Sequence, residues 1–140
     1  MSQTLTEGEV LEGSDFWIAM AIAVDRAVFT SPVLLTQGDI SGSITLNVYG
    51  PYSSAAIYTT TFLKTSSQDG GVTQAIHAAL VDSRWEGEDA IGHNFVYQVR
   101  QADLPGLLKG GKTYTFDFSI PTLQDGNVPA IARVSIKPRH

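Results

Sequence analysis

Apolar and polar residues alternate with a period of two in several short segments, which is the pattern of β-strands that have one buried face. The clearest examples are 43–50 (SITLNVYG), 93–100 (HNFVYQVR) and 113–120 (TYTFDFSI). Segments 56–64 and 130–138 are rich in Thr, aromatic or β-branched residues and are also predicted to be strands. Gly, Pro and Asp lie between these segments, so we expect turns to connect them.

Two other apolar segments are harder to assign. Segment 15–31 (DFWIAMAIAVDRAVFTS) is long enough for a helix, but it has no 3.6-residue apolar stripe and is rich in strand-favouring residues. We therefore expect one or two strands there, ended by Pro32. Segment 72–81 (VTQAIHAALV) is compatible with a strand or a short helix. Turns or loops are predicted at 66–71, 83–92 and 124–127.

This arrangement of about seven short strands predicts an all-β fold, an antiparallel β-sandwich. We divide the chain into residues 1–36, an N-terminal arm with the first strand or strands, and residues 37–140, the sandwich domain. The first 14 residues are polar, and we expect them to be extended. The acidic residues that precede the first apolar run are expected to be solvated: Glu7, Glu9, Glu12 and Asp15.

The composition excludes several classes of protein. The chain has 140 residues, the size of one domain, and only 16% of them are charged, as is typical of a β-rich chain or a surface that contacts other protein. It has no cysteine, which removes disulfides and thiolate chemistry. The net charge of −5 and the lack of a basic patch argue against nucleic-acid binding. Segment 16–24 is too short to span a membrane and has no basic flank, so we expect synthesis in the cytoplasm without a signal peptide.

Residues 106–113 (GLLKGGKT) match the nucleotide-binding pattern G-x-x-x-x-G-K-[ST] through Gly106, Gly111, Lys112 and Thr113. A phosphate-binding loop requires a strand before its first Gly and a helix that begins at the Lys-Thr pair. Here Pro105 precedes the loop, and the residues after Lys112 alternate as a strand does. We interpret the match as chance, expect a Gly-capped turn that leads into a strand, and predict no cofactor and no enzymatic activity.

Other chemistry has weak signals. The three histidines lack metal-ligand spacing and are expected to be structural: His77, His93 and His140. Segment 85–89 (WEGED) offers carboxylates to a cation such as calcium, but EF-hand spacing is absent, so no metal site is predicted. Four aromatic residues are candidates for partner binding: Phe16, Trp17, Phe29 and Trp85. For the two tryptophans, packing in the core is the alternative.

One layout of residues resembles a known family. Its parts are QGDISGSITLNVYG at 37–50, Asp103, Leu107, Gly111, YTFDF at 114–118, DGN at 125–127 and ARVSI at 132–136. Together they resemble the small immunoglobulin-like β-sandwich domains of tailed-bacteriophage virion proteins, such as the N-terminal domain of baseplate upper proteins. The resemblance covers residues 37–138. Two residues rather than one separate the Gly from the Tyr here, and 36 residues precede the GD-containing opening.

The resemblance implies a non-enzymatic structural protein of the virion. Such a protein would dock on capsid, tail or baseplate subunits, as a homo-oligomer such as a trimer. Burial of apolar arm residues and strand addition at sheet edges would hold it in place, so removal of residues 1–30 is expected to leave a folded sandwich that no longer assembles. The alternative is a β-sandwich that binds carbohydrate or a host surface, which requires aromatic residues exposed in a groove.

Overall fold

A computed structural model describes residues 4–24, 33–63, 95–104 and 106–138 of the chain. Its strands are β1 (Thr4–Leu11), β2 (Phe16–Met20), β3 (Ala23–Val24), β4 (Val33–Leu34), β5 (Ile44–Tyr49), β6 (Ala56–Phe62), β7 (Phe95–Val99), β8 (Thr113–Pro121) and β9 (Asn127–Lys137). The helical elements in these ranges are the short 3-10 helices η1 (Gln37–Asp39) and η3 (Gln101–Asp103). The predicted all-β class is confirmed. Within the same ranges, no helix is long and apolar enough to cross a membrane.

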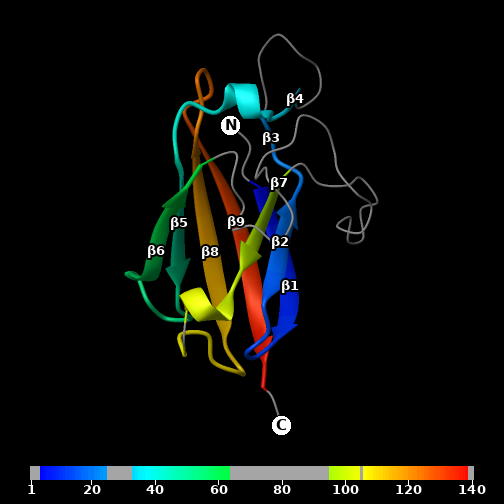
Figure 1. The fold of residues 1–140 in the computed structure, drawn as a ribbon, viewed down its shortest axis with the longest axis vertical. Coiled ribbons are helices and arrows are strands. Elements are labelled where there is room, and N and C mark those ends of the chain that lie inside the picture. The colour runs from blue at the N-terminus through cyan, green and yellow to red at the C-terminus, as the bar shows by residue number, and fades with distance from the viewer. Residues whose placement is uncertain (1–3, 25–32, 64–94, 105, 139–140) are drawn as a thin grey trace.

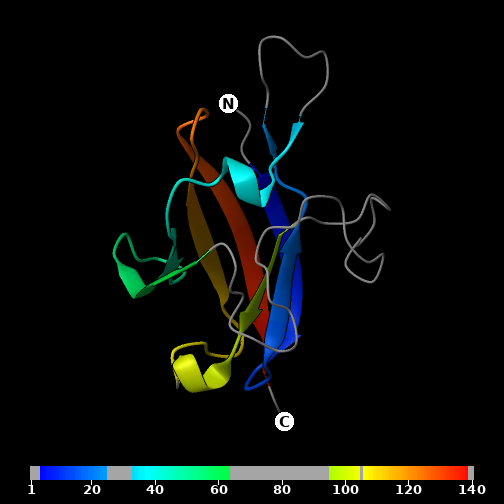
Figure 2. The same ribbon diagram turned by 45° about the horizontal axis from the view of Figure 1, so that its top comes forward.

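The largest sheet has five strands in the order β1-β9-β8-β5-β6. Its inner pairs are antiparallel, as predicted, but β1 runs parallel to β9. Strands β2 and β7 form an antiparallel pair that lies against one face of this sheet (Figures 1 and 2). A third pair, β3 with β4, lies near the end of the sheet at which β8 turns into β9 (Figures 1 and 2). The described chain therefore forms two layers with apolar side chains between them.

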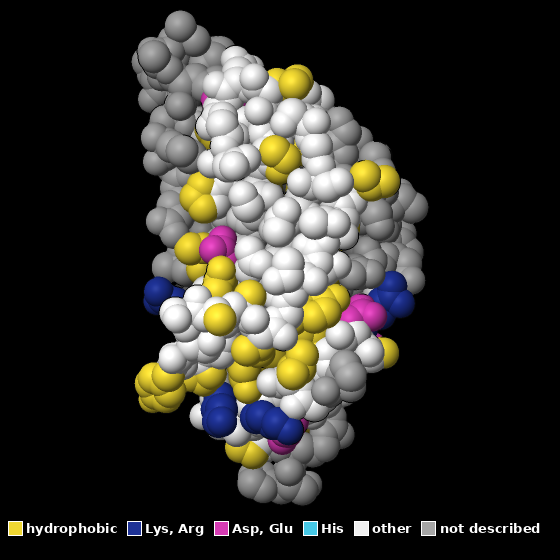
Figure 3. All heavy atoms as spheres, turned by 90° about the vertical axis from the view of Figure 1, so that its left-hand side faces the viewer, with side chains coloured by type: hydrophobic (Ala, Val, Ile, Leu, Met, Phe, Trp, Pro, Cys, Tyr) yellow, Lys and Arg dark blue, Asp and Glu magenta, His cyan; other side chains and the backbone are white. Residues whose placement is uncertain are grey.

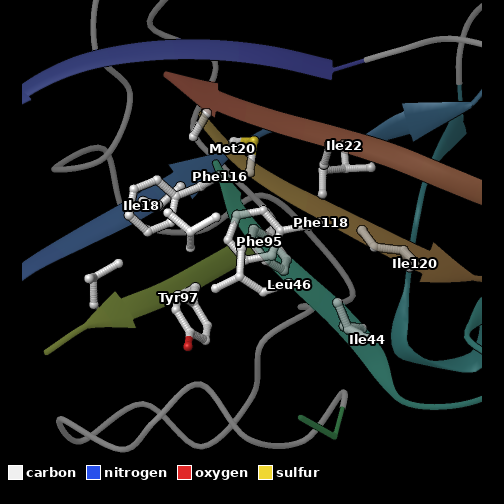
Figure 4. Close-up of a cluster of buried hydrophobic side chains, with 14 of the residues drawn as sticks. Ile18, Met20, Ile22, Ile44, Leu46, Phe95, Tyr97, Phe116, Phe118 and Ile120 are labelled. Carbon is white, nitrogen blue, oxygen red and sulfur yellow. The ribbon is translucent and has the colours of Figure 1, made fainter. Parts of the chain in front are cut away.

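Period-two alternation explains which side of the large sheet is covered. In β8, residues at even positions are buried, and those at odd positions are exposed or half-buried. Strand β5 has the same alternation, which confirms the strands predicted at 43–50 and 113–120. The buried aromatic side chains meet the second layer edge to face, with ring centroids 5.0 Å apart for Phe95 and Phe118 and 5.4 Å apart for Tyr97 and Phe118 (Figure 4). Such contacts favour one packing arrangement of the two layers.

Several uncertain segments are now assigned. Segment 15–31 contains strands β2 and β3, so the strand interpretation is confirmed over its described part. The turn predicted at 124–127 is also present, with Gly126 at a φ of 69° and the Thr122 hydroxyl donating to the Gly126 carbonyl at 2.6 Å. The elements predicted at 66–71, 72–81 and 83–92 lie outside the described residues.

The N-terminal residues differ from the expectation of a solvated arm. Residues 4–11 are extended, but they are paired along their whole length with β9 as strand β1. The carboxylate of Asp15 accepts a hydrogen bond of 2.8 Å from the backbone N–H of Gln101, which ties the β1–β2 turn to η3. Because β2 and the residues after it supply fully buried side chains to the core, the structure does not support the expectation that residues 1–30 can be removed without unfolding the sandwich.

Candidate functional site

The loop that matches the phosphate-binding pattern is built into the sheet. Strand β8 begins at Thr113, where a phosphate-binding loop requires a helix, so the predicted strand is confirmed. The backbone N–H of Gly111 donates to the Ile136 carbonyl at 2.7 Å, and the N–H of Ile136 donates to the Lys112 carbonyl at 2.9 Å. These bonds extend the ladder between β8 and β9. The Gly111 N–H is therefore engaged in the sheet rather than directed at a ligand.

Gly110 in this loop lies against the end of the chain. A Cβ atom at this position would be 2.7 Å from Pro138 Cα and 2.8 Å from a Glu12 carboxylate oxygen. Both distances are below what real Cβ contacts allow, and the backbone of Pro138 cannot move aside without disturbing β9. The loop is thus packed closely against both the β1–β2 turn and the last strand.

Gly110→Ala is therefore expected to lower the free energy of unfolding by about 1–3 kcal/mol, the usual cost of overpacking. Urea denaturation followed by Trp fluorescence would measure the loss. Gly8→Ala is a matched control, because a Cβ at Gly8 meets no atom within 4 Å, and it should change stability by less than about 0.5 kcal/mol. Equal effects of the two substitutions would contradict the close approach at Gly110.

The outer face of the five-stranded sheet carries mainly hydroxyl, amide and charged side chains. Two rows run across β8 and β9, because the register places Thr115 beside Arg133 and Thr113 beside Ser135. The hydroxyl groups of Thr113 and Ser135 lie 3.0 Å apart and share a hydrogen bond. Tyr49 of β5 continues the first row at the position of Thr115. This face thus offers hydrogen-bonding groups at regular spacing.

A groove crosses this face at the end where β8 begins. Its first hollow, of about 510 Å³, is lined by Gly50, Pro51, Tyr52, Gly111, Lys112, Thr113, Thr115 and Arg133. The residues between β5 and β6 form one wall, and there the side chain of Tyr52 is fully exposed. Among the described residues that line this hollow, the charged ones are Lys112 and Arg133, and Glu7 of β1 is the register partner of Arg133. Its volume is within the range of small-molecule sites in proteins.

A second hollow of about 500 Å³ continues the groove toward β1. It shares Thr113 and Arg133 with the first hollow and adds Gly8, Glu9 and Ser135. The carboxylate of Glu9 is 3.2 Å from the ammonium group of Lys137, in an exposed ion pair. The two hollows together cross β8 and β9 from the β5–β6 loop to the first strand.

Asp117 lies farther along the same outer face, in the middle of β8. The register places it between Asn47 of β5 and Ile131 of β9. Burial raises the pKa of this carboxyl, because desolvation disfavours the charged form. An Asp whose pKa is raised in the folded state lowers the free energy of unfolding once it is ionised. Asp117 therefore destabilises the fold at neutral pH.

Asp117→Asn is expected to stabilise the protein at pH 7. The native state of the wild type binds more protons than its unfolded state in the window that begins near the ordinary Asp pKa of about 3.9, so its stability falls as the pH rises through that window. At pH 3 the carboxyl is neutral in both states, and the difference from Asn should largely disappear. Urea midpoints at pH 3, 5 and 7 would measure this, with the exposed Asp103→Asn as the control. Parallel pH curves for the wild type and Asp117→Asn would contradict it.

The structure places only some of the predicted site residues at the groove. Gly106, with a φ of 71°, lies in the loop before β8, whereas Gly111, Lys112 and Thr113 line the first hollow. Phe16 was expected to contact a partner, but it is buried in the core, where its ring meets that of Phe116 edge to face at 6.0 Å. Trp17 is half-buried on the neighbouring position of β2. Phe29 and Trp85 lie outside the described residues.

The sequence did not indicate that Tyr52 and Arg133 are site residues. Tyr52 directly follows the Gly50-Pro51 turn signal, and an aromatic residue in a predicted turn was the clue that the sequence offered. Arg133 lies 21 positions from Lys112, and only the register of β8 with β9 brings it to the same hollow. No three His, Cys, Asp or Glu residues of the described ranges gather where they could hold a metal ion. The three histidines and segment 85–89 are outside those ranges.

Comparisons with known proteins complete the description of the site. No family model, no curated protein and no solved structure matches this chain.

Proposed function

We propose that this chain is a non-enzymatic structural protein of a bacteriophage particle, with an immunoglobulin-like β-sandwich of about seven principal strands. It docks on neighbouring capsid, tail or baseplate subunits and acts as a homo-oligomer. The proposal takes its biological setting from the resemblance over residues 37–138. Its structural support is the edge strand β6.

Strand β6 forms one edge of the five-stranded sheet in the described part of the chain, with a register shift opposite Val48 and Tyr49. Among the described residues it has β5 as its single strand neighbour. Its seven residues, AIYTTTF, include no charged residue and no proline, which are the features that commonly prevent edge-to-edge pairing. The next residue, Leu63, is 62% exposed. On the side of the molecule that β6 occupies, charged side chains are sparse over most of the surface (Figure 3). An uncharged edge strand of this kind suits the addition of a strand from a neighbouring subunit.

The double substitution Thr59→Lys and Thr61→Lys is expected to leave a folded monomer that no longer assembles. Both side chains are exposed, so the fold tolerates Lys, whereas two charges on the edge oppose an incoming strand. Analytical ultracentrifugation would measure self-association, and co-sedimentation with particles from the source would measure docking. The control adds the same charge at the exposed non-strand residues Ser43 and Gln124. Assembly that survives lysines at 59 and 61 would contradict docking through β6.

The proposal that this chain is part of a bacteriophage particle can be tested directly by immunogold electron microscopy of particles from the source, with an antibody to this chain. Gold on heads or on tails is the expected result and separates a capsid role from a tail role. An absence of gold on every particle contradicts the virion proposal.

The second candidate function is a carbohydrate- or host-surface-binding module. One observation favours it, because Tyr52 supplies the exposed aromatic ring beside a groove that this alternative requires. Binding of soluble oligosaccharides that disappears in Tyr52→Ala would support this function. A groove that binds no sugar would leave the assembly role as the better proposal.

A further inference from the structure

The groove on the outer sheet face has a floor that is open to a ligand. Gly8 and Gly111 belong to its two hollows, and a Cβ atom at either position would meet no other atom within 4 Å. The hydroxyl groups of Thr113 and Ser135, and the side chain of Thr115 in the first hollow, provide hydrogen-bonding groups on a rigid sheet. A flat ligand with several hydroxyl groups therefore fits this floor better than an apolar one does.

The charge of the groove is uneven along its length. The first hollow has Lys112 and Arg133 as its charged residues, although the chain as a whole has a net charge of −5. Among the described residues, Glu9 adds a carboxylate to the second hollow, where it pairs with Lys137. Arg and Lys side chains bind carboxylate and sulfate groups through charge-assisted hydrogen bonds. Arg133 lines both hollows, so Lys112 makes the first hollow the more cationic of the two, and an anionic group is favoured there.

The exposed ring of Tyr52 adds an apolar surface to the cationic hollow. Its hydroxyl and ring are both accessible, and the ring belongs to the wall opposite Arg133's strand. Aromatic rings present a broad apolar face with a polar tip, which suits a ligand that is apolar on one face and polar at its edges. A simple inorganic anion would use the cations but not the ring.

We propose that this groove binds an acidic saccharide, that is, a sugar that carries a carboxylate or sulfate group. Lys112 and Arg133 hold the anionic group, the Tyr52 ring stacks on the apolar face of the sugar, and Thr115 bonds its hydroxyl groups. This inference deepens the second candidate function and rests on it, because it names the class of sugar and the residues that select it.

The test measures binding of the full chain to four soluble probes by isothermal titration calorimetry. Tetragalacturonate and 3′-sialyllactose are acidic sugars, maltotetraose is a neutral sugar, and tripolyphosphate is an anion without a sugar. We expect at least one of the two acidic sugars to bind, with an affinity that falls as salt is added. The neutral sugar and tripolyphosphate are expected to bind at least tenfold more weakly.

Variants then locate the site. Lys112→Ala and Tyr52→Ala are each expected to weaken binding of the acidic sugar about tenfold, the effect of losing one charge-assisted or stacking contact. Lys109→Ala is the matched control, because Lys109 is exposed, has the same charge and lies outside both hollows. Its effect should be less than twofold. Circular dichroism of each variant would verify that it is folded.

The possible outcomes distinguish a failure of the acidic-saccharide inference from a failure of the carbohydrate-binding function. Equal binding of maltotetraose would support a carbohydrate module and overturn the selection of acidic sugars. Tripolyphosphate binding that equals that of the sugars and ignores Tyr52→Ala would overturn the saccharide. No binding of any probe at millimolar concentration would overturn both the inference and the carbohydrate module, and it would leave docking through β6 unaffected.

Discussion

Phe118→Ala is expected to lower the free energy of unfolding by about 3–5 kcal/mol, a large part of the stability of a domain of this size. The Phe118 side chain is fully buried in β8. Its ring contacts three others, with centroid distances of 5.0 Å to Phe95, 5.4 Å to Tyr97 and 6.3 Å to Phe62. Alanine would remove one side of all three contacts and leave a cavity between the two layers. Urea or thermal denaturation of the purified variant would measure the loss.

Phe118→Leu is the matched control for this prediction. Leucine keeps most of the buried apolar volume but not the edge-to-face geometry, so it should cost clearly less than alanine. A loss below about 1 kcal/mol for Phe118→Ala would show that the ring is not central to the contact between the layers.

Deletion of residues 1–30 is expected to abolish cooperative folding. The deleted segment includes five buried side chains, those of Phe16, Ile18, Met20, Ile22 and Val24. Truncating one buried side chain of this kind typically costs about 2–5 kcal/mol, so the loss of five, about 10–25 kcal/mol, matches or exceeds the usual total stability of about 5–15 kcal/mol. Thermal denaturation followed by circular dichroism would show a flat, non-cooperative signal.

A shorter deletion separates the roles of β1 and β2. Removal of residues 1–11 takes away the edge strand β1 but leaves β2 and its buried side chains in place. We expect this variant to unfold cooperatively at a lower temperature than the full chain. If the longer deletion also gave a sharp transition, the second layer would not depend on β2.

The sequence predicted the strands that obey period-two alternation and missed what depends on their pairing. Strands β5 and β8 could be predicted from the sequence because their solvent face is polar and their inner face is apolar. Strand β1 contains Glu7, Glu9 and Gly8, which resemble a solvated arm, and only its hydrogen bonds to β9 make it part of the sheet. Local sequence holds no signal for that parallel pairing, because the partner lies more than 100 positions away.

The candidate site shows the same limit. The phosphate-loop pattern could be rejected from sequence, because the alternation after Lys112 is a local property. That Lys112, Arg133 and Tyr52 line the same hollow could not be predicted from the sequence. It depends on the register of β8 with β9 and on the path of the β5–β6 loop.

The parallel pairing of the first strand with the last one has a mechanical consequence. Thr4 is paired with Ala130 at one end of this ladder, and Leu11 with Lys137 at the other. The two strands run side by side in the same direction (Figure 1), so a force that pulls the chain ends apart acts along the ladder in opposite senses on its two strands. Their hydrogen bonds are then loaded together in shear instead of opening one after another. The β1–β9 ladder therefore resists a stretching force that is applied along its strands.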